Sequence, residues 1–372
     1  MPPLRPLAAA LAASLWLAAC TDPAPPAQPA VADPAPPATI EPQPPMPVEP
    51  VAATPPALTI YGPDGYALEP WKKEDLAPAA PDQPANDPAT RSGRDGVLRA
   101  QVLLLRANFS TGEIDGKEGM NVAKAVRAFQ KSRGLPVTGK LDEATWAELD
   151  KDTGPVLTTY TLTQKDIDGP YAPTPKRAED KAKMERIVYQ DIHEMLGEKF
   201  NAKPEFLKAL NPQADFAKAG TELVVPWVRP AQELPKADRV VVSKSEAALQ
   251  LLDAEGKVIA QFPASSGSSA FPLPLGEWKI TSVVHDPDYR YNPDILVNQP
   301  KDAKPATLPP GPNGPVGIVW MGINKQHYGI HGTPEPGQIS RTQSSGCVRL
   351  TNWAAQAVAT AVAVGTPVTF KE

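Results

Sequence analysis

The sequence predicts a multidomain chain in which a mostly-β C-terminal domain with one late helix follows a small three-helix domain and an α+β module. Three observations support this order. A Pro- and Ala-rich stretch occupies residues 21–90. Apolar residues then recur at helical spacing up to about residue 150, and β-rich runs separated by turn residues extend from Arg239 to Phe370. A chain of 372 residues has room for two or three folded units.

Residues 1–20 have the features of a secretory signal. A positive charge at Arg5 precedes an apolar run to Ala19, which is too short to span a bilayer well. The run ends in L-A-A-C, which resembles the lipobox of bacterial lipoproteins and implies that Cys20 is acylated and becomes the mature N-terminus. An ordinary signal peptide cut nearby is the alternative. The resemblance therefore implies a lipid-anchored protein in the periplasm. Because Thr21 follows the cysteine where inner-membrane lipoproteins of enteric bacteria have Asp, it implies that the anchor lies in the outer membrane.

Residues 21–90 are expected to form a disordered, semi-rigid spacer. Twenty of the chain's 47 prolines fall in this stretch. Proline removes backbone donors and favours extended polyproline-like conformations. At about 3 Å per residue, the spacer would reach over roughly 100 Å from a lipid anchor, which is the right order for reaching into a cell-wall layer. Within it, residues 58–71 are less biased in composition and are a candidate for local order.

Residues 91–152 have a helical pattern. An Asp-Gly turn, the segment A-V-x-x-F-Q ending at Gly134, and G-x-L-D-x-x-T-W opening at the expected N-cap Asp142 resemble a type 1 peptidoglycan-binding domain. The resemblance covers about 55 residues with ordered spacings and implies three helices. We expect Phe129 and Trp146 in the core because both fall on apolar helical faces. An idle helical spacer is the alternative to a binding domain.

Residues 158–228 suggest a strand–helix–helix–strand unit. A strand begins near Tyr160, helices are expected at residues 187–196 and 204–210, and a strand returns through G-T-E-L-V-V-P. With L-N-P before it, this pattern resembles a LysM glycan-binding module with an insertion at residues 169–183. A degenerate packing module is the alternative. His193 is interpreted as structural, since no second ligand accompanies it at metal-binding spacing.

Residues 238–371 contain the β-rich runs and one clear helix. The helix is expected from Trp353 to Val364, capped by Thr351-Asn352, and a final strand runs to Phe370. Near the C-terminus the stretch Y-G-I-H-G-T, a spacer, and S-S-G-C-V-R-L contain the only plausible nucleophile–base pair, Cys347 and His331.

Cys347 is the only cysteine outside the leader, so it has no partner for an intramolecular disulfide. It is a small buried hydrophobe, an intermolecular bridge or a reactive thiolate. Gly346 lets its backbone turn sharply, and Arg349 falls on the same face of an extended strand, where its charge would lower the thiol pKa or hold a carboxylate. A cysteine nucleophile needs an imidazole nearby, which His331 is expected to provide.

The full pattern resembles the L,D-transpeptidases, the YkuD-type catalytic domain of bacterial cell-wall enzymes. The similarity runs from about Arg239 to Phe370 and includes P-N-G-P-V-G leading to Trp320, and the segment F-P-L-P-L-G-E-W. The implied fold is a β-sandwich. One departure is visible: many members have a second histidine in S-H-G-C, and Ser345 takes that place here, which should tune the site and not abolish it.

The resemblance implies roles for the site residues. His331 is the base and Cys347 the nucleophile. The Gly332 carbonyl fixes the His331 tautomer, the Gly346 and Cys347 amides stabilise the oxyanion, and Arg349 orients a substrate carboxylate or braces the site. Ser344 gives possible support by hydrogen bonding. His285 and His327 lie outside the I-H-G-T context, although His327 is close enough to line the entrance. No metal or organic cofactor is expected.

The implied reaction attacks the peptidoglycan stem tetrapeptide after the L-centre of its third residue, releases D-alanine and transfers the thioester to an amine. The product is a 3–3 cross-link or a protein attached to the wall. Two alternatives remain: an L,D-carboxypeptidase, and a non-catalytic wall-binding tether. The net charge of −5 and the absence of a dense basic run argue against nucleic acid. Expected partners are therefore stem peptides, glycan and a wall-anchored acceptor protein, with membrane contact only through the N-terminal lipid.

Overall fold

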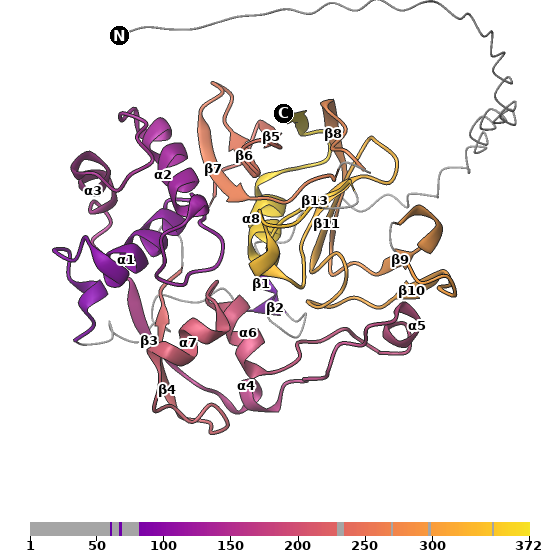
Figure 1. Ribbon diagram of the computed structural model, residues 1–372, viewed down its shortest axis with the longest axis horizontal. Helices are drawn as coiled ribbons and strands as arrows, with labels where there is room; N and C mark the ends of the chain where they lie inside the picture. Colours follow the sequence, from indigo (N-terminus) through magenta and orange to yellow (C-terminus); the bar gives the residue numbers. More distant parts are fainter. Residues whose placement is uncertain are drawn as a thin grey trace, which may run out of the picture. The chain divides into compact units, whose positions relative to one another are not determined.

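The computed structural model of the protein (Figure 1) describes residues 60–61, 67–68, 82–228, 234–268, 271–296, 299–343 and 346–372. The expected leader with Cys20, most of the spacer, and Ser344 lie outside the described residues. Strands β1 (Ile60–Tyr61) and β2 (Ala67–Leu68) pair antiparallel within the patch that was a candidate for local order. Residues 55–372 belong to one compact unit.

The spacer was expected to reach residue 90, and the structure corrects this boundary. A short 3-10 helix, Pro84–Asn86, packs on the chain that follows the three-helix domain. Asn86 Nδ2 donates to the Leu157 carbonyl at 3.1 Å, and its Oδ1 accepts from the backbone N–H groups of Val156 at 2.9 Å and Leu157 at 2.8 Å. Composition suggested a linker, but one asparagine that satisfies backbone groups 70 residues away fixes this segment.

The helical domain contains α1 (Gly93–Arg106), α2 (Met120–Arg133) and α3 (Glu143–Leu149). The two predicted helix boundaries are confirmed: Gly134 ends α2 in the left-handed region at φ 69°, and the Asp142 side chain accepts from the Thr145 N–H at the start of α3. Phe129 and Trp146 are buried in the core as expected.

Gln130, which follows the core residue Phe129 in α2, bonds to the turn after the helix. Its side chain is fully buried. Nε2 donates to the Lys140 carbonyl at 3.0 Å and to the Thr145 hydroxyl at 2.8 Å, while Oε1 accepts from the Gly139 N–H at 2.8 Å. This one buried amide therefore holds the largely exposed turn between α2 and α3 from its inner side.

The following module has β3 (Leu157–Thr161) and β4 (Glu222–Pro226) paired antiparallel, with four helices between them. The helices are α4 (Gln164–Asp168), α5 (Ala178–Lys181), α6 (Ile192–Lys199) and α7 (Pro204–Leu210). The helix expected at residues 187–196 begins later, because the Asp191 side chain caps α6 by accepting from His193 N and Glu194 N. Residues 187–189 are instead buried outside any helix, and Ile187 exchanges backbone hydrogen bonds with Pro310 and Asn313.

The helical domain and this module share one hydrophobic core, which also includes Val258 of the C-terminal domain. Backbone hydrogen bonds join the parts. Ile114 donates to Asn201 and accepts from Lys203, and Ser110 and Asn108 bond to Gln261 at the edge of the large sheet. The three parts that the sequence patterns distinguish therefore pack against one another and are not independent domains joined by linkers.

The C-terminal domain is built on a sheet whose order is β13-β12-β11-β8-β14-β5-β6-β7. The strands are β5 (Arg239–Ser243), β6 (Ala248–Leu252), β7 (Val258–Pro263), β8 (Gly276–His285), β11 (Val319–Ile323), β12 (Gly329–His331), β13 (Val348–Arg349) and β14 (Pro367–Lys371). A separate hairpin joins β9 (Tyr289–Tyr291) to β10 (Ala306–Leu308), and 3-10 helices span Pro293–Ile295 and Pro336–Gln338.

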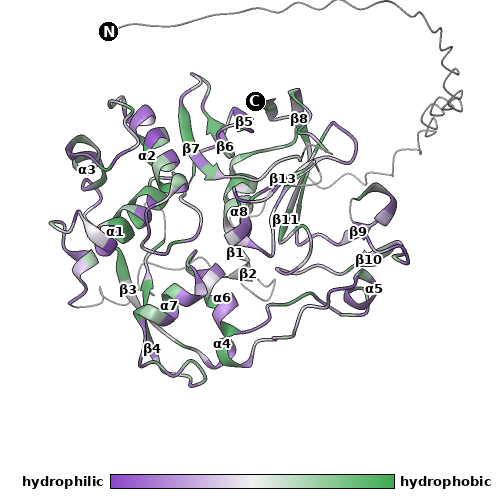
Figure 2. Cartoon of the chain, in the orientation of Figure 1, coloured by the Kyte–Doolittle hydropathy of each residue, from purple (hydrophilic) through white to green (hydrophobic). Residues whose placement is uncertain are grey.

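The expected sandwich is one continuous sheet, because the long strand β8 belongs to both halves. Residues 276–279 of β8 pair with β14, and residues 280–285 pair with β11. The two ends of the sheet meet where Ser265, just after β7, exchanges backbone hydrogen bonds with Arg349 of β13 at 2.8 and 3.0 Å. Apolar side chains of the strands and of α8 (Asn352–Ala361) form the enclosed core, and Figure 2 shows this hydrophobic colouring along the strands.

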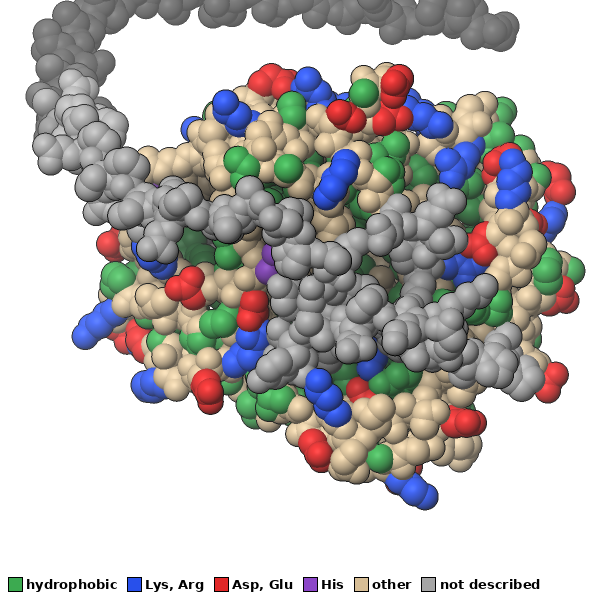
Figure 3. Space-filling view, turned by 180° about the vertical axis from the view of Figure 1, so that it is seen from behind, with side chains coloured by type: hydrophobic (Ala, Val, Ile, Leu, Met, Phe, Trp, Pro, Cys, Tyr) green, Lys and Arg blue, Asp and Glu red, His purple; other side chains and the backbone are tan. Residues whose placement is uncertain are grey.

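The surface of the described residues carries both signs of charge. On the face in Figure 3, Lys and Arg side chains are interspersed with Asp and Glu where described atoms are visible. None of the helices in the described ranges has the length and apolar character needed to cross a membrane.

Replacing Gln130 by Leu tests the role of its amide. We expect Gln130→Leu to lower the free energy of unfolding by about 1–3 kcal/mol, because the Gly139 N–H and the Thr145 hydroxyl lose a buried partner. Chemical denaturation followed by circular dichroism measures the change. Gln164→Leu is the matched control, since Gln164 is exposed and its Nε2 donates to the nearby Asp168 carboxylate. Equal stability of the two variants would contradict this role.

Candidate functional site

The parallel strands β12 and β13 bring His331 and Cys347 together. Their register pairs Ile330 with Val348 and His331 with Arg349, so Cys347 lies directly before a strand that runs beside the histidine strand. His331 is buried, and Cys347 is partly exposed. His331 and Cys347 are sixteen residues apart in the sequence, but they lie on or next to neighbouring strands because β12 and β13 pair in the sheet.

The tautomer of His331 is defined by its backbone partner. Nδ1 lies 2.7 Å from the Gly332 carbonyl oxygen, which only accepts, so Nδ1 carries the proton. Nε2 of the neutral ring is then a proton acceptor. Burial lowers the His331 pKa to about 4, the Gly332 contact raises it in part, and the Arg349 charge lowers it further. The imidazole is therefore neutral at physiological pH.

Two aromatic rings fix the walls of the site. Trp320 of β11 stacks on the His331 ring with centroids 5.5 Å apart and an interplanar angle of 20°. Tyr328 lies over Gly346, where an added Cβ would come within 2.8 Å of the ring. Gly346 also has a φ of +107°, so only glycine is unstrained at this position.

The Cys347 thiol is protonated in this state. Burial raises its pKa, while the Gly329 backbone and the Arg349 charge lower it by less. The sequence interpretation gave Arg349 two alternative roles, lowering the thiol pKa or holding a substrate carboxylate. The direction of that effect is right, but the structure shows that burial outweighs it. Sγ donates to the His327 carbonyl oxygen at 3.6 Å, so His327 contributes its backbone to the site.

Arg349 braces the neighbouring loop. Its Nη2 donates to the Thr342 hydroxyl at 3.0 Å and to the Gln343 carbonyl at 2.7 Å. Its Nε is buried without a hydrogen-bond partner. Two roles were expected for Arg349, orienting a substrate carboxylate and bracing the site. The hydrogen bonds to Thr342 and Gln343 correspond to the second.

Sequence reasoning missed three residues near the site. Tyr289 of β9 has a raised pKa, first because of burial and second because a charge on Cys347 would disfavour the phenolate. Asn352 was read only as part of a helix cap, although Thr351 performs the capping by accepting from Ala354 N. The Asn352 side chain instead packs on Gly332 and bonds Glu198 of α6. No local pattern signals a contact across 154 residues.

The other histidines do not join the pair. His285 ends β8, and burial lowers its pKa. His193 packs edge-on against Phe216 with centroids 4.8 Å apart. Within the described ranges, no group of three or more His, Cys, Asp or Glu side chains is arranged to hold a metal ion.

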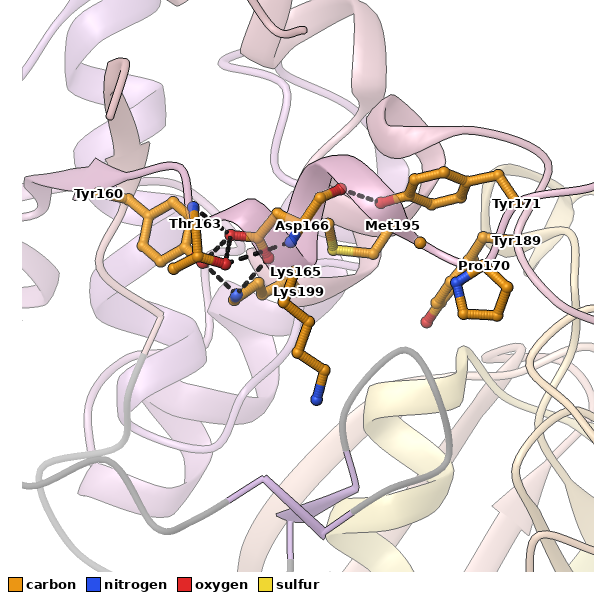
Figure 4. A pocket seen from close by; sticks show the side chains of 10 residues that line it. Tyr160, Thr163, Lys165, Asp166, Pro170, Tyr171, Tyr189, Met195 and Lys199 are labelled. Atoms are coloured by element: carbon orange, nitrogen blue, oxygen red, sulfur yellow. Dashed lines mark hydrogen bonds and ion pairs between the residues drawn. The ribbon is translucent and has the colours of Figure 1, made fainter. Parts of the chain in front are cut away.

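Away from the His331–Cys347 pair, a hollow lies in the module between β3 and α6, with a volume of about 150 Å³. Figure 4 shows its polar side, where Asp166 accepts from the Tyr160 hydroxyl at 2.6 Å and pairs with Lys199 at 3.2 Å. Tyr171 closes another side and donates to the Asp166 carbonyl oxygen. The hollow thus combines aromatic rings with charged groups, as small-molecule sites do.

Comparison with known families identifies two parts of the chain. Residues 237–370 match the family model described as "L,D-transpeptidase catalytic domain", and residues 93–149 match a "putative peptidoglycan binding domain". The region from β5 to β14 is therefore an L,D-transpeptidase catalytic domain, and the enzyme class is that of the L,D-transpeptidases. The two matches together imply peptidoglycan as the substrate.

Curated relatives agree with this class. The chain is 28% identical over 190 residues to "Putative L,D-transpeptidase YkuD" of Bacillus licheniformis, covering 50% of this chain and 98% of that protein. A protein of the same name from Bacillus subtilis is 28% identical over 152 residues, covering 41% and 76%. An L,D-transpeptidase structure from Xylanimonas cellulosilytica covers 79% of this chain and 95% of its own, with 16% identity and a TM-score of 0.32, too low to add to the assignment.

The protonation of the pair gives a pH prediction. In the free protein, iodoacetamide should alkylate Cys347 at a rate that rises about tenfold per pH unit from pH 6 to 8 without a plateau, because only the thiolate reacts and the thiol pKa lies higher. Arg349→Gln should slow alkylation at each pH, since it removes a charge that lowers the thiol pKa. Mass spectrometry of quenched samples measures the rates.

Arg341→Gln is the control for this experiment, because it removes the same charge from an exposed neighbour. A plateau between pH 6 and 8 in the unmodified protein would show a preformed thiolate–imidazolium pair and contradict the neutral pair.

Proposed function

We propose that this protein is a lipid-anchored peptidoglycan L,D-transpeptidase in which Cys347 is the nucleophile and His331 the general base. The observation that carries the proposal is the locked His331 tautomer beside Cys347. A neutral imidazole with Nδ1–H held by Gly332 leaves Nε2 as the acceptor that a protonated thiol needs.

The proposed reaction has two acyl-transfer steps. His331 Nε2 takes the Cys347 proton, and sulfur attacks the carbonyl that follows the L-centre of the third stem residue, usually diaminopimelate. The bond to D-alanine breaks, His331 returns the proton to the leaving amine, and a thioester remains on sulfur. An amine then attacks the thioester and restores the thiol, with His331 accepting the amine proton.

The backbone around the nucleophile supports stabilisation of the intermediate. Gly346 has a positive φ and lies under Tyr328, so a sharp turn directly precedes the nucleophile. We assign the oxyanion to the Gly346 and Cys347 amides, a contribution of about 3 kcal/mol for each donor. Arg349 is assigned to bracing the loop at residues 342–343.

The acceptor amine defines the biological outcome. A second diaminopimelate gives a 3–3 cross-link, and a lysine of a wall-anchored protein gives attachment of that protein. The proposed location is the periplasm, with Cys20 acylated in the outer membrane and the Pro-rich residues 21–81 as a spacer. The peptidoglycan-binding match at residues 93–149 supports a protein that works within the wall.

Analysis of muropeptide products tests the proposed function. Tetrapeptide muropeptides incubated with the full chain should lose D-alanine and form 3–3 dimers, and Cys347→Ala and His331→Gln should reduce both by at least about a thousandfold. Liquid chromatography with mass spectrometry measures the products. Tripeptides without dimers, even with added diaminopimelate amine, would indicate a carboxypeptidase. No product from folded protein would contradict the catalytic assignment and favour a tether.

We also propose that residues 157–228 form a LysM-like glycan-binding module whose ligand enters the hollow in Figure 4. The antiparallel pairing of β3 with β4, the helices α6 and α7 between them, and the Tyr171 ring in the lining of the hollow support this assignment. A sugar ring would lie on the aromatic face while its hydroxyls bond to the charged groups.

Cosedimentation with glycan strands stripped of stem peptides tests the module, because the catalytic site has no substrate there. We expect Tyr171→Ala to reduce the bound fraction of the full chain about tenfold at limiting glycan, since the aromatic wall is removed. Tyr171→Phe is the matched control and should bind like the unmodified protein. Equal binding by Tyr171→Ala would exclude the hollow as a glycan site.

A further inference from the structure

A buried carboxyl group from the module between β3 and β4 reaches the rear of the catalytic histidine. Glu198, near the end of α6, accepts two hydrogen bonds from Asn352 Nδ2, at 2.9 Å on Oε1 and 3.0 Å on Oε2. The Tyr189 hydroxyl donates to Oε2 at 3.0 Å. This cluster of Glu198, Asn352 and Tyr189 lies at a junction between two parts of the chain that have separate sequence patterns.

Asn352 is in direct contact with the peptide that orients His331. The side chain is fully buried at the start of α8. Its Oδ1 lies so close to Gly332 that an added Cβ there would be 2.2 Å away, and it accepts from the Ile318 N–H at 3.4 Å. The Gly332 N–H in turn donates to Val319. The Gly332 peptide is thus held between β11 and the Asn352 amide.

Glu198 sets the orientation of that amide. Among the described residues, Nδ2 donates to Glu198 and to the Pro312 carbonyl, the latter at 3.2 Å, and Oδ1 faces Ile318 and Gly332. Without Glu198, Nδ2 would keep the Pro312 carbonyl alone as its acceptor, and the amide would be held in this orientation by fewer hydrogen bonds. The chain of contacts therefore runs from Glu198 through Asn352 and Gly332 to His331 Nδ1.

We propose that Glu198 is a positioning residue for the transpeptidase reaction: through Asn352 it fixes the Gly332 peptide, and with it the tautomer and the orientation of the His331 ring. This inference rests on the function proposed above for His331. It makes the module before the catalytic domain a structural part of the active site, in addition to any role in binding the wall.

The electrostatic state of Glu198 agrees with this position. Burial raises its pKa to about 8, Asn352 and Tyr189 lower it in part, and Glu194 and Glu113 raise it. The side chain is therefore mostly protonated at neutral pH, which avoids a buried ion. In this form the acid O–H on Oε2 donates to the Tyr189 hydroxyl oxygen, and Oε1 still accepts from Asn352 Nδ2. A buried polar group of this kind contributes little to stability compared with an apolar residue of similar size. Its hydrogen bonds to Asn352, behind the catalytic histidine, give it a specific role.

Further contacts between the segment at residues 186–194 and the catalytic domain help to hold α6 in place. The insertion before α6 crosses the loop at residues 305–315, where Ile187 bonds to Pro310 and Asn313. Asn313 Nδ2 donates to Glu194 at 3.0 Å, and Arg186 pairs with Asp286 after β8 at 2.7 Å. These contacts hold α6 where Glu198 reaches Asn352.

Three substitutions in the full chain test the proposal. Glu198→Gln keeps a neutral side chain of the same shape and should retain kcat within about threefold at pH 7. Glu198→Asp retracts the carboxyl group by one methylene, about 1.5 Å, and should lower kcat about tenfold with KM within a factor of two. Glu198→Ala should lower kcat at least as much. Glu205→Gln, on an exposed site of α7, is the matched control.

Readouts at His331 separate positioning from a merely structural role. Nitrogen-15 spectra of histidine-labelled protein should show the protonated Nδ1 of His331, assigned by its loss in His331→Gln, in the unmodified protein and in Glu198→Gln. The signal should broaden or shift to the other tautomer in Glu198→Asp. Cys347 alkylation rates, which need no peptide substrate, and thermal unfolding are measured on the same samples.

An unchanged kcat and an unchanged His331 signal in folded Glu198→Asp would overturn the proposal, whatever Glu198→Ala does to folding. Equal losses of kcat in Glu198→Gln and Glu198→Asp would also overturn it, since the amide should rescue. If no variant or unmodified protein forms peptide products, the proposed function fails, while the spectra still decide whether Glu198 positions His331.

Discussion

The hydrogen bond from His331 Nδ1 to the Gly332 carbonyl is the contact on which the site depends. It decides which imidazole nitrogen is free, and the pair cannot work with the other tautomer. Several elements converge on this one peptide: Trp320 of β11 stacks on the ring, Val319 holds the Gly332 N–H, and Asn352 of α8 packs on the Cα. The sheet order β13-β12-β11 places these groups side by side.

The resting site stores the nucleophile as a neutral thiol. Burial raises the Cys347 pKa and lowers the His331 pKa, so the two shifts oppose formation of an ion pair before substrate arrives. A protonated thiol resists oxidation and adventitious alkylation better than a thiolate. Proton transfer then belongs to the step in which sulfur attacks, when negative charge passes to the acyl oxygen.

Much of the local structure was predictable because it depends on neighbouring residues. The Asp142 cap, the Gly134 turn and the core positions of Phe129 and Trp146 follow from patterns within a few residues. The roles of His331 and Cys347 as base and nucleophile were implied by a resemblance that spans the domain, whereas the parallel pairing of their strands became visible only in the structure. The failures were non-local. Asn86 orders residues assigned to the spacer, Asp191 delays α6, and Glu198 contacts Asn352 across 154 residues. Burial also reversed the net effect expected at the Cys347 thiol, and burial is a property of the whole fold.

The most direct test of the central claim is intact-protein mass spectrometry of the full chain, quenched in acid within milliseconds to seconds of mixing with a tetrapeptide stem and no amine acceptor. The account predicts a mass increase equal to the tripeptide acyl group, located on Cys347 after digestion, with D-alanine released in equal amount. Turnover of the stem without any adduct on Cys347, or an adduct that persists in Cys347→Ala, would contradict nucleophilic catalysis by this residue.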